Sequence, residues 1–244
     1  MAAMNAIILA GGYAKRLLPL TKDTPKPLLG IAGRPMVEHV LDKLADVSPA
    51  RIFIVTNSKF YPAFQQWLQH YSQKNITMVN DQTTGNEDRL GAVGDIHFTL
   101  ARHAISDDIL IVAGDNLFDL SLREFLAFAA GRPSIVSHDV KDRGLAKLYG
   151  IVSINAAGRI TSFEEKPAEP ASTLASTCIY FFPRKTIPAI SEYIAQGNPT
   201  DKSGHFIQWL SEKTAVYSMV TEKPWFDIGS KEQLEEVRRW KQSS

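Results

Sequence analysis

Two basic and two acidic side chains occupy positions in this sequence that suit the binding of a polyphosphate. Arg16 and Lys26 lie on one loop that opens with Gly11-Gly12, and paired glycines let backbone N–H groups approach phosphate oxygens. An arginine fork and a lysine point charge on such a loop complement phosphate. Asp115 and Asp227 are candidates to hold a divalent cation over the same phosphates.

The loop is the most informative segment of the chain. Residues 9–29 read LAGGYAKRLLPLTKDTPKPLL, and Pro25 and Pro27 hold the backbone on either side of Lys26 extended. Neither the Walker A pattern nor G-x-G-x-x-G is present. A Gly-Gly pair after a strand is more often a plain turn. Two cations on the same loop favour a ligand site.

Each acid has a second reading. Asp115 follows the apolar run 109–113, where it could bind a divalent ion or, like Asn116, cap a following helix. Asp227 could point into a cavity or cap a helix that starts near Ser230, and Ser230 could supply that cap itself. Glu165-Lys166 comes at the end of another expected strand, and the residues alone favour an exposed polar strand end over a ligand site.

The elements that must position these residues alternate in type. Residues 6–10, 51–55 and 109–113 are continuous hydrophobic runs, as in parallel strands buried on both faces. Helices are expected at 35–47, 60–72 and 92–104. This rhythm predicts an α/β fold, a doubly wound sheet with helices on both faces and ligands at the carboxyl ends of its strands.

The second half of the chain has a different rhythm. Short strands are expected at 134–137, 149–154, 159–164 and 174–182, with a hairpin turn at 155–158. Helices are expected at 183–195 and 231–240. With no linker or composition shift in sight, residues 1–244 are expected to form a single domain.

The composition of the chain limits the classes of partner and the compartment that are expected. Lys and Arg number 27 and Asp and Glu 26, a net charge of +1, so no global field attracts nucleic acid or an anionic membrane. The single cysteine, Cys178, suits a reducing cytosol and is expected to be a core residue. With no basic segment before the first apolar run, and no run near the roughly 20 residues that span a bilayer, a cytoplasmic protein is expected.

The loop resembles the signature of the sugar-1-phosphate nucleotidylyltransferases, GG-x-G-T-R-L-x-P-L-T…P-K-P-L. The family's usual Gly-Thr is replaced by Ala14-Lys15, and motifs similar to the family's extend over about residues 5–230. The matching residues of the signature are Gly11, Gly12, Arg16, Leu17, Pro19, Leu20, Thr21, Pro25, Lys26 and Pro27.

The resemblance implies a Rossmann-like mixed sheet of the nucleotide-diphospho-sugar transferase type. Its nucleotide-binding half would be about 1–130 and its sugar-binding half about 131–244, with no C-terminal β-helix domain. The implied reaction joins a nucleoside triphosphate to a sugar 1-phosphate with Mg²⁺ and releases pyrophosphate. dTTP or UTP with glucose 1-phosphate is the favoured pair. Assembly into a homo-oligomer is left open.

The resemblance also assigns roles to single residues. Arg16, Lys26 and Asp115 would be catalytic, and Asp115 and Asp227 would hold the metal. The nucleotide would be bound by Leu9, Ala10, Gly11, Gly12, Gln82 and Gly91, with Gln82 placed to read a pyrimidine edge. The sugar phosphate would be bound by Asn116, Gly150, Glu165, Lys166, Thr177 and Tyr180.

Two rival functions stay open. A relative could use CTP and another phosphorylated acceptor, such as phosphocholine or inositol phosphate, and the Ala14-Lys15 departure permits this. A non-catalytic regulatory subunit that binds nucleotide sugars is the rival from another class. Such a subunit is expected to have lost a metal-binding acid or a phosphate-binding lysine, whereas this sequence keeps Asp115, Asp227, Lys26 and Lys166.

Overall fold

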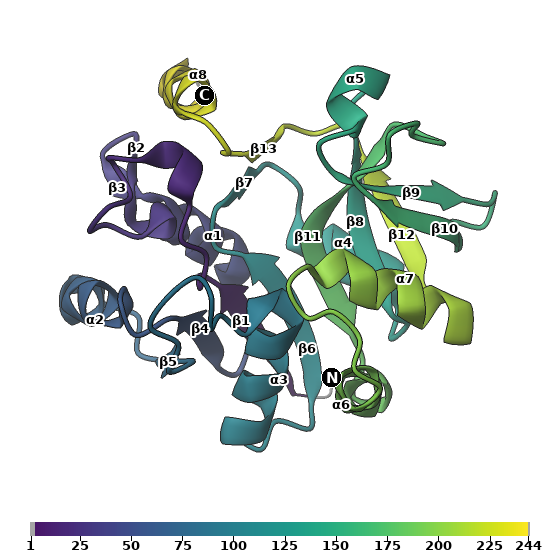
Figure 1. The fold of residues 1–244 in the computed structure, drawn as a ribbon, viewed down its shortest axis with the longest axis horizontal. Helices are drawn as coiled ribbons and strands as arrows, with labels where there is room; N and C mark the ends of the chain where they lie inside the picture. The colour runs from purple at the N-terminus through teal and green to yellow at the C-terminus, as the bar shows by residue number, and fades with distance from the viewer. Residues whose placement is uncertain (1–2, 244) are drawn as a thin grey trace.

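The computed structural model describes residues 3–243, with side chains to residue 241. A nine-stranded mixed sheet runs through the molecule (Figure 1), with the order β10-β9-β11-β6-β1-β4-β5, and β8 and β12 branch from β11. The strands are β1 (Met4–Leu9), β4 (Ile52–Thr56), β5 (Ile76–Asn80), β6 (Asp108–Ala113), β8 (Ser134–Asp139), β9 (Gly150–Ile154), β10 (Ile160–Glu165), β11 (Leu174–Phe182) and β12 (Tyr217–Thr221).

The N-terminal part of the sheet is parallel. β1 lies between β4 and β6, and β5 pairs with the outer side of β4. Helices cover both faces: α1 (Met36–Ala45), α2 (Tyr61–His70) and α4 (Leu122–Ala129) lie on one, and α3 (Gly91–Arg102), α6 (Ile187–Ala195) and α7 (Ser203–Lys213) on the other. Successive side chains of β1 point to opposite faces of the sheet. Ile7 packs in the hydrophobic cluster that contains α3, and Ile8 packs in the cluster that contains α1. The doubly wound prediction is therefore confirmed.

Antiparallel pairing begins at β11. Its C-terminal half pairs with β6, where Ile179 faces Val112, and its N-terminal end pairs with β9. β8 pairs with β11 on both sides of a bulge between Ser176 and Tyr180. Cys178 sits in this bulge with a left-handed backbone, φ 56°. The bulge lets one strand serve both halves of the sheet.

A small two-stranded ribbon lies beside the carboxyl end of the main sheet. Its strands are β7 (Asn116–Phe118) and β13 (Trp225–Asp227), which pair antiparallel with Asp227 opposite Asn116. The ribbon therefore joins the segment after β6 to a segment more than a hundred residues later. Two short strands, β2 (Gly30–Ile31) and β3 (Arg34–Pro35), and helices α5 (Arg143–Ala146) and α8 (Lys231–Ser243) complete the fold.

The expected strands and helices appear within a few residues of their predicted bounds, and Gly158 closes the 155–158 turn by donating its N–H to the Asn155 carbonyl. The longer elements that were not expected are β5, β12, α4 and α7, and the short strands β2, β3, β7 and β13 and the short helix α5 were not expected either. β5 reads ITMVN and lies at the sheet edge with only Val79 fully buried, so it lacks the hydrophobic run of a central strand. Among the described residues, no helix has the length and hydropathy required to cross a bilayer.

Candidate active site

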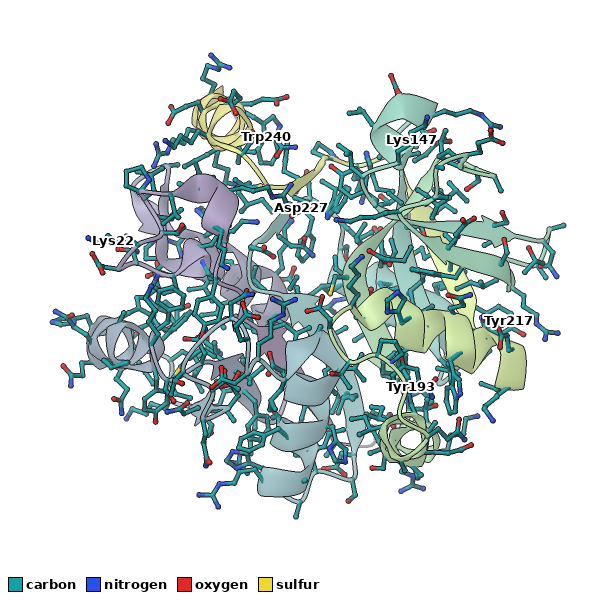
Figure 2. The ribbon with its side chains drawn as sticks, viewed as in Figure 1. Lys22, Lys147, Tyr193, Tyr217, Asp227 and Trp240 are labelled. Atoms are coloured by element: carbon teal, nitrogen blue, oxygen red, sulfur yellow. The ribbon has the colours of Figure 1, made fainter. Side chains whose placement is uncertain are left out.

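Three charged side chains from distant parts of the chain meet at the carboxyl end of the parallel strands. The Lys26 Nζ atom lies 2.6 Å from Asp115 Oδ2 and 3.5 Å from Asp227 Oδ1. Asp115 follows β6, and the β7–β13 ribbon carries Asp227 alongside it. Figure 2 shows Asp227 between the half of the molecule that holds β1 and the half that holds β8 and β9. The two acids thus share one cation.

The acid pair carries more negative charge than its surroundings readily accept. The pKa of Asp227 is raised by partial removal of its carboxyl from water and by the nearby Asp115, while Lys26 and Arg16 oppose that rise. Lys26 is itself only 9% exposed at its side chain. A buried lysine between two acids is stable only while the lysine and the acids have partners of opposite charge. A bound anion could replace an acid as the partner of Lys26, and a bound cation could replace Lys26 as the partner of the acids.

Neither acid caps a helix. Asp115 is followed by strand β7, and the next helix, α4, is capped by Ser121, whose hydroxyl accepts from the Glu124 N–H. The N–H of Gln233 donates to Ser230 Oγ at 3.2 Å, so Ser230 caps α8. Both carboxylates are left available to a ligand.

Arg16 extends the positive charge along the loop. It lies in a 3-10 helix, η1 (Lys15–Leu17), is exposed, and packs over Gly229, where an added Cβ would come within 3.2 Å of its Nη2 atom. Ala14 precedes it in the left-handed region with φ 43°, where the resembling family has glycine. A cavity of about 180 Å³ is lined by Leu9, Ala10, Gly12, Ala14, Arg16, Lys26, Pro27, Asp115 and Asp227.

A second cavity, of about 520 Å³, opens from the acids toward the C-terminal half. The side chain of Glu165 reaches this cavity between Gly150 and Gly204. A Cβ atom added to Gly150 would lie 2.9 Å from Glu165 Oε2, and one added to Gly204 would lie 2.5 Å from it. Gly150 therefore makes room for Glu165, in addition to lining the cavity. Lys166 follows in the left-handed region (φ 53°), exposed and lining the same cavity. Tyr180 lines it too, and its hydroxyl lies 3.1 Å from both Ser176 Oγ and Ser203 Oγ.

Lys202 is a cavity residue that sequence reasoning missed. It lies just before α7, lines the 520 Å³ cavity, and places its Nζ atom 3.5 Å from Glu165 Oε1. It gives this cavity a second lysine beside Lys166. The one local sign was the amphipathic stretch 203–213, which indicates the helix that Lys202 precedes.

A third cavity, of about 350 Å³, lies on the N-terminal side and is lined in part by Leu9, Gly11, Gly12 and Gly91. It shares Ala92, Asp115, Cys178 and Asp201 with the 520 Å³ cavity. Gly91 has φ 79°, and a Cβ there would lie 2.4 Å from the Asp201 Cα. Cys178 lies at the shared wall, partly buried, and desolvation raises the pKa of its thiol to about 12. It packs against the core cluster from this position and is not enclosed by it.

The structure places three of the expected ligand residues away from the cavities. Gln82 is exposed and lines none of these cavities; Asp81 faces inward instead. Asn116 is buried, donating to the Thr177 carbonyl and accepting from Trp225 Nε1 at 3.3 Å. Thr177 donates its hydroxyl to the Val136 carbonyl at 2.9 Å. Within the described part of the chain, Asn116 and Thr177 hold the ribbon, β11 and β8 together and do not line the cavities.

An α/β sheet with a glycine loop, cations and paired acids at its carboxyl edge is typical of folds that bind phosphate-bearing nucleotides. The sequence matches the family model described as Nucleotidyl transferase over residues 5–243. The chain belongs to this nucleotidyl transferase family.

Relatives of several specificities resemble the chain. It is 32% identical over 186 residues to the UTP–glucose-1-phosphate uridylyltransferase AglF of Haloferax volcanii, covering 73% of this chain and 72% of that protein. It is 26% identical over 226 residues to the bifunctional protein GlmU of Methanocaldococcus jannaschii, covering 93% of this chain and 51% of the relative. The fold matches a Bacillus anthracis protein assigned as a glucose-1-phosphate thymidylyltransferase, crystallised with sucrose, with a TM-score of 0.83, 25% identity and coverage of 98% and 95%.

The chain spans about half the length of two of the archaeal relatives it matches. What those longer proteins do as wholes therefore does not transfer to this chain directly.

Proposed function

We propose that this chain is a sugar-1-phosphate nucleotidyltransferase, which joins a nucleoside triphosphate to a sugar 1-phosphate and releases pyrophosphate. The observation that carries the proposal is the Lys26–Asp115–Asp227 centre, because Asp115 lines all three cavities. A nucleotide in the 350 Å³ cavity and a sugar phosphate in the 520 Å³ cavity would meet there.

The reaction needs positioning and charge, and no protein nucleophile. An oxygen of the sugar phosphate attacks the α-phosphorus, a new P–O bond forms, and the bond to the β-phosphate oxygen breaks in line as pyrophosphate leaves. Two anions about 4 Å apart repel by several kcal/mol at an effective dielectric near 20. The chain must therefore bring cations to both substrates.

The available cations divide between the two substrates. Arg16 and Lys26 both line the small cavity. Arg16 would bind the leaving pyrophosphate, and Lys26 would bind the α-phosphate. Lys166 and Lys202 line the sugar cavity and suit the incoming phosphate, with Glu165 available to a sugar hydroxyl. To bind phosphate, Lys26 would give up its ion pair with one acid and keep its ion pair with the other.

The acid pair fits a magnesium ion. Across the described residues no cluster of three or more His, Cys, Asp or Glu offers a complete protein cage, and Mg²⁺ typically takes one or two carboxylates plus phosphate oxygens and water. Asp115 and Asp227 would hold it, and the raised pKa of Asp227 indicates that the pair gains from added positive charge. When bound, the ion would neutralise charge on the phosphates.

The test is release of pyrophosphate from a matrix of substrates with magnesium present. ATP, GTP, CTP, UTP and dTTP would be combined with glucose 1-phosphate, mannose 1-phosphate, N-acetylglucosamine 1-phosphate, phosphocholine and inositol phosphate. Release with a sugar 1-phosphate supports the proposal. Release only with phosphocholine or inositol phosphate favours the cytidylyltransferase reading, and none with any pair favours a regulatory subunit.

A further inference from the structure

Helix α8 packs against the loop that carries Arg16. Its side chains Leu234 and Val237 are fully buried, and they belong to one hydrophobic cluster with Leu17, the residue after Arg16. Figure 1 shows α8 beside β2, which follows the same loop in the chain. The position of the loop backbone next to Arg16 therefore depends on α8.

The side chain of Arg16 has no charged partner that fixes it. It is exposed, and within the described part of the chain it forms no hydrogen bond or ion pair. An arginine side chain has many rotamers, and a ligand that orders them loses part of its binding free energy. Arg16 is ready for a phosphate only if the surface beneath it limits where its guanidinium can lie.

Gly229 provides such a surface. A Cβ atom added to Gly229 would lie 3.2 Å from Arg16 Nη2 and 3.4 Å from Arg16 Cζ. The guanidinium therefore lies where any other residue at position 229 would place its side chain. Arg16 lines both the 180 Å³ and the 520 Å³ cavity, and Asp115 and Asp227 also line both. Gly229 thus supports the guanidinium at the boundary between these two cavities.

Gln233 holds Gly229 in place from the first turn of α8. Its Oε1 atom accepts from the N–H of Gly229 at 2.8 Å and would lie 3.3 Å from the same added Cβ atom. Gln233 also lines the 520 Å³ cavity with Tyr149. Burial raises the pKa of Tyr149, while the Gln233 amide and the charge of Arg16 oppose that rise. Gln233 and Arg16 therefore act on the same part of the cavity wall.

We propose that Gly229 and Gln233 are positioning residues, which direct Arg16 toward the phosphates that leave as pyrophosphate. The inference rests on the proposed function for the role of Arg16. Gly229 leaves room for the guanidinium, and Gln233 fixes the backbone of Gly229. Because a side chain that is already ordered binds its ligand at a lower entropic cost, loss of either residue should weaken the binding of pyrophosphate.

Gly229→Ala tests the space beneath the guanidinium. The backbone of Gly229 lies outside the left-handed region, so alanine fits it without strain, and the exposed Arg16 side chain can move aside. Binding of inorganic pyrophosphate to the full chain would be measured by isothermal titration calorimetry with magnesium. Affinity should fall about 3- to 10-fold, because Arg16 is displaced but kept. Gly30→Ala is the matched control, since a Cβ atom there meets nothing within 4 Å, and it should bind as wild type does.

Gln233→Met tests the contact from α8. Methionine keeps the length of the side chain and removes the acceptor for the Gly229 N–H, so affinity for pyrophosphate should fall by a similar factor. Gln65→Met, exposed on α2, is the matched control and should bind as wild type does. Wild-type affinity in either Gly229→Ala or Gln233→Met would overturn the inference. Should one of the two variants not fold, the other decides it.

A double-mutant cycle separates positioning from a general structural effect. Arg16→Met should weaken pyrophosphate binding by roughly 10- to 100-fold, the range for loss of a hydrogen bond to a charged group. Adding Gly229→Ala or Gln233→Met to Arg16→Met should cause no further loss, because both residues act through Arg16. A further loss of the same size in that background would contradict the proposal. Unchanged affinity in Arg16→Met alone would contradict it too.

Failure here is distinguishable from failure of the proposed function, because the calorimetry needs no turnover. If substrates yield pyrophosphate and the two variants bind it as wild type does, the positioning inference falls and the nucleotidyltransferase stands. If no pair of substrates yields pyrophosphate, the enzymatic proposal falls, and the calorimetric cycle still judges the contact of Arg16 with Gly229 and Gln233. A wild-type chain that does not bind pyrophosphate would overturn the positioning inference.

Discussion

The guanidinium of Arg89 lies 2.7 Å from the Asp201 carboxylate and joins the loop before α3 to the loop before α7. Two backbone bonds reinforce this link, from the N–H of Ala92 to the Asp201 carbonyl and from the N–H of Val93 to the Thr200 carbonyl. The next residue after Asp201 is Lys202, which lines the sugar cavity. The wall of the nucleotide cavity is thus tied to a cation of the sugar cavity.

Arg89→Gln should therefore raise the KM for both substrates by roughly 3- to 10-fold. The ion pair is exposed, so the free energy of unfolding should change by no more than about 1 kcal/mol. Steady-state kinetics with each substrate varied in turn would measure this. Arg238→Gln, which breaks an exposed pair on α8, serves as the control. If only the KM for the nucleotide changed, the Arg89–Asp201 link would not affect binding in the sugar cavity.

Lys202→Met should act on the sugar phosphate alone. Its Nζ atom lies in the sugar cavity beside Glu165, and losing one charge-assisted contact to phosphate costs about 1.5–3 kcal/mol. We expect the sugar-phosphate KM to rise about 10-fold or more while the Kd of the triphosphate stays constant. Lys213→Met, at the far end of α7, is the matched control. Weakened triphosphate binding would contradict the assignment of Lys202.

Asp115→Asn and Asp227→Asn should each lower kcat by about 100- to 1000-fold, the range for loss of one group that stabilises transition-state charge. The pKa of Asp227 is raised by burial and by Asp115, so replacing that carboxylate with a neutral amide should not lower the melting temperature. Turnover and calorimetric unfolding at pH 8 would be measured together. Near-normal magnesium-dependent rates in either variant would remove the metal assignment.

Asp81 and Asp95, two buried acids below Gly11, predict a pH dependence of stability. Asp95 keeps its proton up to about pH 8 in the folded state and loses it near its ordinary value of 3.8 when unfolded. The folded state therefore binds more protons between these values, and its free energy of unfolding falls as pH rises through that window. Asp95→Asn has no such charge, so its melting temperature should gain on wild type from pH 5 to pH 8.5. A constant difference between the two proteins would argue against the raised pKa.

Ala14 offers a test of the signature loop. Its left-handed backbone, φ 43° and ψ 45°, costs an alanine about 1–2 kcal/mol, and the loop is fixed there by the Thr21 hydroxyl, which donates to the Ala14 carbonyl at 2.9 Å. Ala14→Gly relieves this strain, and the greater entropy of glycine in the unfolded chain offsets part of the gain, so the variant should be more stable by up to about 1 kcal/mol. Ala127→Gly, exposed in α4, should destabilise by about 1 kcal/mol. Chemical denaturation would compare them.

Much of the fold was readable because its signals are local. The hydrophobic runs of β1, β4 and β6 and the stripe of α1 depend on nearest neighbours in sequence. The loop that carries Arg16 and Lys26 could be found for the same reason. Their meeting with Asp115 and Asp227 followed from the rule that parallel strands end at a common edge.

The errors arose where tertiary contacts decide. One residue of register at the end of β5 turns Asp81 inward and Gln82 outward, and no sequence pattern fixes that step. The amide of Asn116 is used by Thr177 and Trp225, both distant in sequence. Asp95 looks like a residue of a solvated helix face, yet Gly11 covers it.

The wall of Ala92, Asp115, Cys178 and Asp201 belongs to both large cavities. Under the proposed function, one compound that carries a base and a sugar on a diphosphate would occupy both at once and lose its translational freedom only once. The nucleotide sugar made by the enzyme is such a compound. Its departure is then expected to limit the catalytic cycle, and non-hydrolysable mimics of it should inhibit more strongly than mimics of either substrate alone.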